Sequence, residues 1–502
     1  MIKDVLKQFF TYGFGNILQT ALSFILLPLY LRFFPPNEYG IISVLTVVMS
    51  LLTLFISGGV MNGLIRLYYE ADGIRRKELV GATCLWYLVV GVLGGGILFS
   101  QALPLSEALF HTEAYRDSIR ILGFVFFFSM LRSVPLYILR LEKKASLYVG
   151  FSLFSFLADF SLKLYLIVSL GRGVLGYFES SAIASMMTLC IMIPFVSKYI
   201  RFYPEISFVK QLLRLGIPYI ISGFAMWTLD VSDRLLLNHF SGEAAVGIYS
   251  LGYNFANIFG ILLATPLALL MDPFFFSYAA ERSADDTKKL LQRTFSYFFI
   301  VGSIFYLAIA LGSGELIRVF TSHFGAKEKY LEATNLVPIL ALAPLLYFMA
   351  TQAGLAALLV KKPEITSVAC LIAAGINFGL NLFIVPIYGT LGAAVTTVVA
   401  YLVLGIIIYW WVGKIFPVKH DWRGMVRGIF YLAIAFALGS QIRLDQPVVS
   451  LFVKVGIGVT VFTSLTLFTG NILTKTERDK IRVYLLDFKK RLASALVSRS
   501  LE

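Results

Sequence analysis

Long apolar runs dominate the pattern of this chain. Segments of about 20 mostly apolar residues recur from Phe9 to Phe468, with short polar connections between them. A helix needs about 20 residues to cross a hydrocarbon layer about 30 Å thick. The runs are continuously apolar and do not alternate every second residue, which predicts helices and not the strands of a barrel. We therefore predict an all-α, polytopic membrane protein.

The same pattern predicts about 14 transmembrane helices. The expected spans are 9–33, 38–65, 80–103, 119–141, 146–170, 174–197, 215–240, 245–275, 290–312, 334–359, 363–388, 389–412, 428–443 and 447–470. The joins at 240–245 and 388–389 have no clear polar gap. We place them from an internal repeat.

The repeat consists of four matches that occur in the same order in both halves. The segment DFSLK begins at Asp159 and NFGLN begins at Asn377, an offset of 218. The other pairs are Lys143-Lys144 with Lys361-Lys362 (offset 218), GVLG from Gly173 with GTLG from Gly389 (offset 216), and GIIS from Gly40 with GIYS from Gly247 (offset 207). Repeats of this kind indicate that the chain arose by duplication.

A repeat of six spans, an even number, inserts both copies in the same direction. Such halves are related by a pseudo-twofold axis along the membrane normal, and a substrate site is expected between them near the midplane. We predict two six-helix lobes around a central cavity, at 1–200 and 201–415. Two extra spans at 416–472 and a cytoplasmic, basic amphipathic tail at 473–502 would follow.

The distribution of charge adds one prediction, the orientation of the chain in the membrane. The formal net charge of +14 could suggest a nucleic-acid partner. However, Lys and Arg gather in alternate connecting segments, and the expected outer segments hold only Arg32, Arg116, Arg120, Arg172, Arg318, Lys327, Lys329 and Arg443. This is the positive-inside pattern, which predicts that both termini are cytoplasmic. It also explains the basic excess without nucleic acid.

Charged residues inside the spans are the candidates for function. Such a group costs at least about 2.5–3.5 kcal/mol at the membrane centre, so it usually faces a partner or a watery cavity. Asp159 with Lys163, and Asp230 with Arg234, have the i, i+4 spacing of helical ion pairs. These pairs could equally serve only to let each helix insert. Asp233 is left without a local partner.

Other spans contain isolated cations. Arg132 is alone in the fourth span, although it could snorkel to the inner surface. Lys454 is expected to snorkel to the outer surface. Arg32 and Arg66 end the first two spans, where anchoring is the default interpretation.

We find no enzyme or cofactor signal. The chain has no nucleotide-binding glycine loop, no nucleophile elbow and no zinc-protease motif, and its outer loops are too short for a catalytic domain. Cys84, Cys190 and Cys370 all fall in spans, where they are expected to act as small apolar residues. The four histidines form no metal-ligand cluster. The expectation is a protein that is not an enzyme and that binds no cofactor or metal.

Three segments of the chain resemble those of a known family. EYGIISVL after the first span, IPYIISGFAMWTLDVSDRLLLNHF followed by AVGIYSLGY, and NFGLNLFIVPIYGTLGAAVTT resemble the polysaccharide transporter (Wzx-like) branch of the multidrug/oligosaccharidyl-lipid/polysaccharide exporter superfamily. The resemblance covers roughly residues 5–415, and the two extra spans are similar to those of the related lipid II flippases. It implies a flippase in the bacterial plasma membrane that moves an undecaprenyl-diphosphate-linked oligosaccharide, as in O-antigen synthesis, to the outer leaflet. Membrane lipids and other glycan-assembly proteins would be its partners.

The resemblance also implies a cationic central cavity that holds the diphosphate. The substrate-binding candidates are Arg32, Arg66, Arg132, Lys163, Arg234, Asn377 and Asn381. Asp159, Asp230 and Asp233 are the candidates to carry Na⁺ or H⁺ if transport is ion-coupled. The chain departs from the family in having few unpaired arginines deep in its first lobe.

Two other functions remain open at this stage. A multidrug/cation antiporter of the same superfamily would need an acidic, aromatic cavity, which Arg132, Lys163 and Arg234 disfavour. A glycan polymerase or ligase would need a large outer loop with catalytic groups.

Overall fold

The computed structural model describes residue 24 and residues 27–201 and 205–469 of the 502-residue chain. These residues form helices joined by short connections, and no strand occurs among them. The predicted all-α class is confirmed. Most of the first predicted span and the basic tail from 473 lie outside the described residues.

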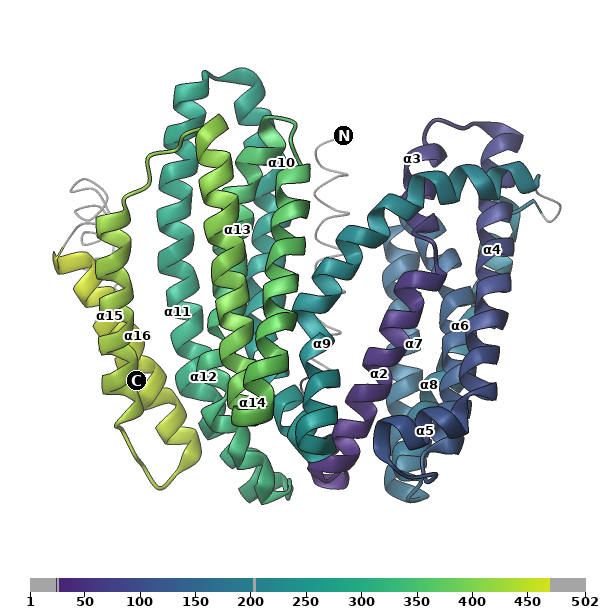
Figure 1. Ribbon diagram of the computed structural model, residues 1–502, viewed down its shortest axis with the longest axis horizontal. Coiled ribbons are helices and arrows are strands. Elements are labelled where there is room, and N and C mark those ends of the chain that lie inside the picture. The colour runs from purple at the N-terminus through teal and green to yellow at the C-terminus, as the bar shows by residue number, and fades with distance from the viewer. Residues whose placement is uncertain (1–23, 25–26, 202–204, 470–502) are drawn as a thin grey trace, which may run out of the picture. The chain divides into compact units, whose positions relative to one another are not determined.

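The helices follow one another with few long connections (Figure 1). They are α2 (Pro36–Ile56), α3 (Val60–Tyr68), α4 (Gly73–Ser100), α5 (Ala102–Phe110), α6 (Arg116–Leu141), α7 (Ala145–Lys163), η1 (Leu164–Ser169), α8 (Gly173–Val196), η2 (Ser197–Tyr199), α9 (Ile206–Phe259), η3 (Gly260–Ala264), α10 (Thr265–Glu281), α11 (Ala284–Phe324), η4 (Glu328–Asn335), α12 (Val337–Leu340), α13 (Leu342–Leu359), α14 (Glu364–Ile415), α15 (Trp422–Ser440) and α16 (Pro447–Thr469).

Ten helical runs among the described residues are long and apolar enough to cross a membrane. Two of them contain two predicted spans each. Within α9, Gly242 has non-helical angles (φ 79°, ψ 173°), and within α14, Gly389 does (φ 54°, ψ −130°). Glycine adopts such positive φ angles without steric cost. The breaks confirm the predicted joins at 240–245 and 388–389, while the total of 14 spans stays a prediction.

Side-chain contacts show that the chain reverses at both breaks. Tyr249 donates a hydrogen bond to Asp233, 16 residues earlier, and Thr396 donates one to Asn381, 15 residues earlier. A continuous helix would separate such residues by more than about 20 Å, because it rises 1.5 Å per residue. Each long run is therefore a helical hairpin that turns at a glycine.

The structure corrects two parts of the predicted span map. The second span was expected to be continuous over 38–65, but α2 ends at Ile56 and α3 begins at Val60. Gly58 and Gly59, with φ angles of 64° and 63°, make the turn between them. The region 104–118, predicted to be an outer loop, contains most of the short helix α5.

The internal repeat has a structural counterpart at two helix ends. Lys143 and Lys361 both have φ 57°. At each site the next lysine donates its backbone N–H to the carbonyl five residues earlier, Lys144 to Leu139 and Lys362 to Ala357. This is the Schellman arrangement that closes a helix with a left-handed residue. It falls at the predicted offset of 218.

A second counterpart is a reciprocal contact between α2 and the hairpin of α9. A Cβ atom on Gly40 would lie 1.8 Å from the Glu243 carbonyl oxygen, and one on Gly247 would lie 1.9 Å from the Pro36 carbonyl oxygen. Ser43 and Ser250, 207 residues apart, share a hydrogen bond of 2.7 Å. In a twofold contact, residue i meets j and j meets i. These contacts have that form and support the duplication.

The chain folds into two compact units, each built from several stretches of sequence. The first contains Met1–Asn254, Val319–Leu340 and Thr366–Leu404, and the second contains Phe255–Arg318, Ala341–Ile365 and Gly405–Glu502. In the first unit, α6 packs against α4 and α8, and α7 packs against α8. In the second unit, α15 and α16 pack against each other. The predicted lobes and their boundaries stay a prediction.

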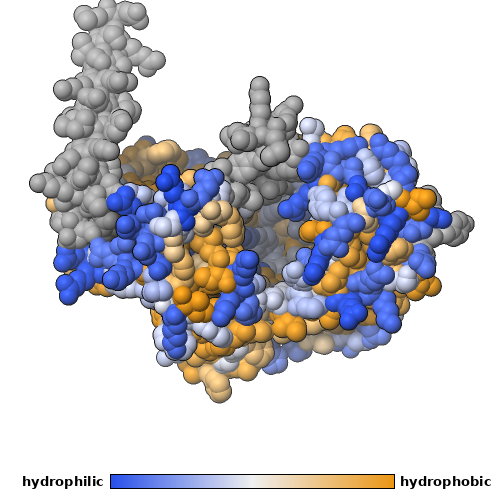
Figure 2. All heavy atoms as spheres, turned by 90° about the horizontal axis from the view of Figure 1, so that it is seen from above, coloured by the Kyte–Doolittle hydropathy of each residue, from blue (hydrophilic) through white to orange (hydrophobic). Residues whose placement is uncertain are grey.

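Polar side chains gather at the helix ends. Figure 2 looks onto the ends that are uppermost in Figure 1, and hydrophilic residues cover much of this surface, with hydrophobic residues along the flanks. Such a distribution fits helices that expose their apolar flanks to lipid. The chain is a multi-pass membrane protein.

Candidate functional site: polar clusters within the spans

Asp233 lies at the centre of a buried cluster in the first unit. Asp233 is only 1% exposed, and one carboxylate oxygen, Oδ2, accepts hydrogen bonds from the hydroxyls of Tyr249 and Thr397, the latter at 3.4 Å. The other oxygen, Oδ1, is buried without a hydrogen-bond partner among the described residues. The hairpin at Gly242 brings Tyr249 to Asp233, and α14 supplies Thr397. Both side-chain partners of Asp233 are therefore distant in sequence, 16 and 164 residues away.

Asp230 and Arg234 do not form the expected salt bridge. Asp230 Oδ1 accepts hydrogen bonds from Tyr401 and, at 3.4 Å, from Tyr253. Arg234 instead places its guanidinium 4.8 Å from the centre of the Tyr253 ring. An arginine over an aromatic face is attracted by the negative ring face. Tyrosine side chains therefore replace the ion pair that the i, i+4 spacing predicted: hydroxyls bind the carboxylate, and a ring contacts the guanidinium.

Asn377 and Asn381 are fully buried in α14. Asn381 donates its Nδ2 to Asn377 Oδ1 at 3.2 Å, and its own Oδ1 accepts from Thr396. Because Thr396 and Thr397 are consecutive, they connect the asparagine pair to the Asp233 carboxylate. Asn377 Nδ2 has no hydrogen-bond partner among the described residues. This group therefore holds two unsatisfied polar atoms, Asp233 Oδ1 and Asn377 Nδ2.

The second predicted pair does form. Lys163 Nζ lies 2.7 Å from Asp159 Oδ2, and Ser181 donates to Asp159 Oδ1 at 2.9 Å. Lys163 is only 5% exposed, and its Nζ lies 3.9 Å from the centre of the Tyr177 ring. A carboxylate and an aromatic face together hold this ammonium group at membrane depth.

The predicted cations separate into two groups. Arg132 donates to the Ser155 hydroxyl at 2.7 Å and interacts electrostatically with Asp159, so it belongs to the Lys163 cluster. Arg32 and Arg66 are exposed and belong to neither cluster. Tyr39 on α2 accepts a hydrogen bond from Asn254 at 2.9 Å and lies within range of the Arg234 charge. A shared open space around the Lys163 and Arg234 clusters stays a prediction.

Sequence reasoning missed the tyrosines. Tyr249, Tyr253 and Tyr401 hold Asp230 and Asp233, yet a tyrosine in an apolar span gives no pattern that distinguishes it from packing. The one available signal was the spacing of Tyr249 and Tyr253, which places both on one helix face. Tyr249 and Tyr253 meet Asp233 and Asp230 only because the chain reverses at Gly242.

A third polar group lies in the second unit. Lys454 was expected to snorkel outward, but its side chain is 12% exposed and donates to Glu315 in α11. That prediction is wrong, because the Lys454 ammonium group pairs with the buried Glu315 carboxylate and does not extend to the surface. Glu315 also lies 3.3 Å from Arg318.

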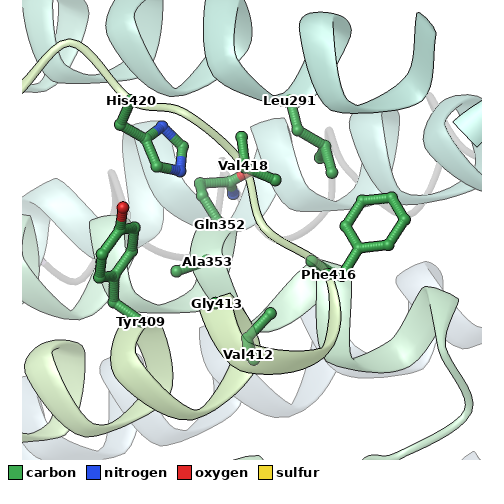
Figure 3. A pocket seen from close by; sticks show the side chains of 10 residues that line it. Leu291, Gln352, Ala353, Tyr409, Val412, Gly413, Phe416, Val418 and His420 are labelled. Atoms are coloured by element: carbon green, nitrogen blue, oxygen red, sulfur yellow. The ribbon is translucent and has the colours of Figure 1, made fainter. Parts of the chain in front are cut away.

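The second unit also contains a small cavity of about 20 Å³, room for about one water molecule. Figure 3 shows His420 and Tyr409 along one side and Phe416 and Leu291 along the other, with Gln352 between them. Trp422 donates to the Tyr409 hydroxyl at 3.1 Å, and His420 Nδ1 is buried without a hydrogen-bond partner among the described residues. Burial lowers the pKa of His420 to about 4.

The chemistry of these clusters is that of binding. Carboxylate, hydroxyl and amide oxygens around Asp233 can hold a proton or a hard cation. Arg132 and Lys163 can attract an anion such as a phosphate. Among the described residues, no group of three or more His, Cys, Asp or Glu side chains could hold a metal ion.

Known structures identify the fold class. The structure of the lipid II flippase MurJ in an inward closed conformation matches with a TM-score of 0.73 and 16% identity, over 93% of this chain and 99% of that one. A multidrug resistance MATE family transporter of the MOP superfamily, in an inward-facing conformation, matches with a TM-score of 0.66 and 16% identity, over 81% of this chain and 94% of the other. The chain has the fold that these transport proteins share.

The sequence comparisons then identify the family. The profile of a family described as "Polysaccharide biosynthesis protein" matches residues 30–283, half of the chain, and the protein belongs to this family. The uncharacterized membrane protein MJ1068 of Methanocaldococcus jannaschii is 25% identical over 256 residues, which are 49% of this chain and 48% of that protein. The match thus spans about half the length of this curated relative.

Proposed function

We propose that this protein is a flippase that moves an undecaprenyl-diphosphate-linked oligosaccharide from the inner to the outer leaflet of a bacterial plasma membrane. The observation that carries the proposal is the pair of cations within the spans of a polysaccharide biosynthesis family protein, a half-buried Arg132 and a buried Lys163. Its fold, shared with a lipid II flippase over nearly the whole chain, supports the same function.

The physical task explains why such a cluster is useful. A sugar headgroup cannot cross hydrocarbon unaided, because each unsatisfied hydroxyl costs several kcal/mol. A polar passage lined by Arg132 and Lys163 stabilises the diphosphate while the lipid tail stays in the bilayer. An inside-negative potential favours outward movement of an anion by about 2.3 kcal/mol per charge per 100 mV. Transport then needs no ATPase in the chain.

The test is translocation in vesicles. Purified protein is reconstituted with a labelled undecaprenyl-diphosphate oligosaccharide, and the labelled lipid that becomes accessible to an added lectin is measured over time. Wild-type protein is expected to accelerate this exposure, and Lys163→Gln is expected to slow it at least tenfold. Lys454→Gln is the matched control, because it also removes a buried lysine paired with a carboxylate.

Two results would contradict the proposal. Exposure at the protein-free rate would exclude a flippase for this lipid. Export of cationic dyes without lipid movement would favour the multidrug/cation antiporter instead.

Ion coupling is proposed at Asp233. Its unsatisfied Oδ1, together with the hydroxyl of Thr397, fits a small cation or a proton that oxygen ligands can hold. When bound, the ion supplies a positive charge that offsets the buried carboxylate. Asp233→Asn is expected to abolish any dependence of thermal stability and transport on Na⁺ or pH, whereas Asp159→Asn, in the other cluster, should retain it. A dependence that persists in Asp233→Asn would refute this assignment.

A further inference from the structure

Two apolar cavities lie along the same pair of helices in the first unit. The inner cavity has a volume of about 410 Å³ and the outer one about 330 Å³. Both are lined by α4 and α6, and α8 contributes to the inner one. Ligand pockets in proteins typically have volumes of about 300–1,000 Å³.

The lining residues place the two cavities one after the other along one face of α4, and together we call them the track. On α4 they are Gly81, Cys84, Leu85 and Leu88 in the inner cavity and Gly91, Val92, Gly95, Gly96 and Phe99 in the outer one. Successive steps of three and four residues keep all of them on one helix face. From Gly81 to Phe99 the helix rises about 27 Å, close to the hydrocarbon thickness of about 30 Å.

The track is open to long, thin apolar groups. Leu88 is 43% exposed and Val92 56% exposed. A Cβ atom on Gly96 would have no neighbouring atom within 4 Å, so this glycine borders free space and not a packed helix. The polar lining is confined to the inner end, which Ser197 and Arg201 border.

One basic residue, Arg201, borders that inner end. Arg201 is exposed and donates its backbone N–H to the carbonyl of Lys77, which is also exposed. One guanidinium nitrogen of Arg201 lies 2.6 Å from Glu78. The guanidinium has five N–H donors, so Arg201 keeps donors for an anion while it is paired with Glu78.

We propose that this track holds the polyprenyl chain of a polyprenyl-phosphate lipid, with the phosphate at Arg201 before the headgroup enters the site of Arg132 and Lys163. The inference rests on the proposed flippase function and assigns a tail site to its substrate. An acyl chain of a phospholipid reaches only across one leaflet, about half the hydrocarbon thickness. A single track that runs along both halves fits a longer chain. Because it continues into the outer half, the tail keeps its contacts while the headgroup crosses.

The experiment measures lipid binding to the full-length protein by native mass spectrometry. The probes are undecaprenyl phosphate, farnesyl phosphate, whose chain is short enough for the inner half alone, and dioleoyl phosphatidylglycerol. Gly96→Leu extends a side chain into the outer half from a position where an added Cβ has no atom within 4 Å, and Leu88→Trp obstructs the inner half. Gly456→Leu is the matched control, because Gly456 lies in α16 and also has no atom within 4 Å of an added Cβ.

Gly96→Leu is expected to weaken undecaprenyl phosphate binding about tenfold, since it displaces several buried methylenes, and to leave farnesyl phosphate binding unchanged. Leu88→Trp should weaken both. Equal binding of undecaprenyl phosphate by wild type and Gly96→Leu would overturn the proposal. So would a loss of phosphatidylglycerol binding that matches the loss of undecaprenyl phosphate, because it would show that ordinary acyl chains fill the track.

The outcomes separate this inference from the proposed function. If both track variants translocate the labelled oligosaccharide lipid at the wild-type rate and bind undecaprenyl phosphate normally, the tail site is wrong and the flippase proposal stands. If wild-type protein does not translocate that lipid, the flippase proposal fails, and the binding data then decide the track on their own.

Discussion

At the scale of single residues, the left-handed lysines are the clearest points of strain. Lys143 and Lys361 close their helices at φ 57°, where a Cβ atom clashes with the backbone and glycine does not. Each lysine is also a basic residue in a segment expected to face the cytoplasm. At both positions the backbone conformation thus favours glycine, whereas the expected cytoplasmic location favours a basic residue.

We predict that Lys361→Gly stabilises the protein by about 1 kcal/mol, because glycine adopts this conformation without strain. Thermal unfolding in detergent provides the measurement. The control is Lys362→Gly, which also removes one positive charge but at the adjacent residue, where φ is not positive. It should not stabilise the protein. Equal shifts in both variants would show that charge, and not backbone strain, is responsible.

His420 predicts a pH effect. Burial lowers its pKa to about 4, whereas an unfolded histidine has a pKa of about 6.5. Between these values the unfolded chain takes up a proton that the folded protein does not, so stability should fall as the pH drops from about 6.5 to 4. Melting temperatures measured across this range should fall less steeply for His420→Gln than for wild type. Parallel curves would refute the assignment.

Residue-scale prediction from sequence succeeded where partners are local. Asp159 and Lys163 lie one helical turn apart, and their pairing follows from that spacing. It failed at Asp230, where Tyr401 from a distant helix competes with the neighbouring Arg234. The choice between a local charge and a distant hydroxyl depends on how the hairpins pack, and spacing alone does not contain that information.

At the scale of helices, close backbone contact fixes how α2 meets the hairpin of α9. Gly40 packs against the Glu243 carbonyl and Gly247 against the Pro36 carbonyl, so closely that a Cβ atom at either glycine would overlap with that oxygen. Small residues generally let membrane helices approach in this way.

We predict that Gly40→Ala destabilises the protein by about 1–3 kcal/mol, because the methyl group must displace the Glu243 carbonyl. Gly150→Ala is the control, since nothing lies within 4 Å of its added Cβ, and it should be neutral or stabilising. Thermal unfolding of the two variants side by side decides the matter. If Gly40→Ala melts at or above the temperature of Gly150→Ala, the contact is not tight in the folded protein.

The ion pair between α11 and α16 makes a second prediction at this scale. Lys454→Met leaves the buried Glu315 carboxylate with only the more exposed Arg318, and should cost about 3 kcal/mol. Adding Glu315→Gln should recover most of the loss, because the unpaired charge is then removed. A double variant no more stable than Lys454→Met would show that packing dominates at this site.

Helix-scale prediction relied on the repeat. The hairpin turns at Gly242 and Gly389 lack polar gaps, and only the register of the first half showed where they fall. The break at Gly58 and Gly59 was missed because two glycines in an apolar run do not by themselves end a membrane helix. The repeat could not correct this, since none of its matches covers that position.

At the scale of the whole molecule, the prediction concerns orientation. In a chain without Cys84, Cys190 and Cys370, Lys362→Cys should react with a membrane-impermeant maleimide only from the cytoplasmic side, and Glu113→Cys only from the outside. Both positions are exposed at helix connections. Labelling of intact cells and of inverted vesicles provides the measurement. The reverse pattern would invert the topology.

Whole-molecule prediction from sequence was strongest for class and weakest for the site. Continuous apolar runs determine an all-α membrane protein, because backbone groups must be satisfied within each span. The tyrosine partners of Asp230 and Asp233 depend on how distant helices pack, which the sequence pattern does not show. The α4–α6 track was also invisible to sequence, since a concave apolar surface and a packed one use the same residue types.

The hydrogen bond between Ser43 and Ser250 carries a historical consequence. If two separate copies of one gene product once paired at this point, the serine met its own counterpart, so a single codon change altered both partners at once. After fusion into one chain, each serine had its own codon and could change independently of the other. The two serines are still alike, as expected of a contact that once joined two identical chains.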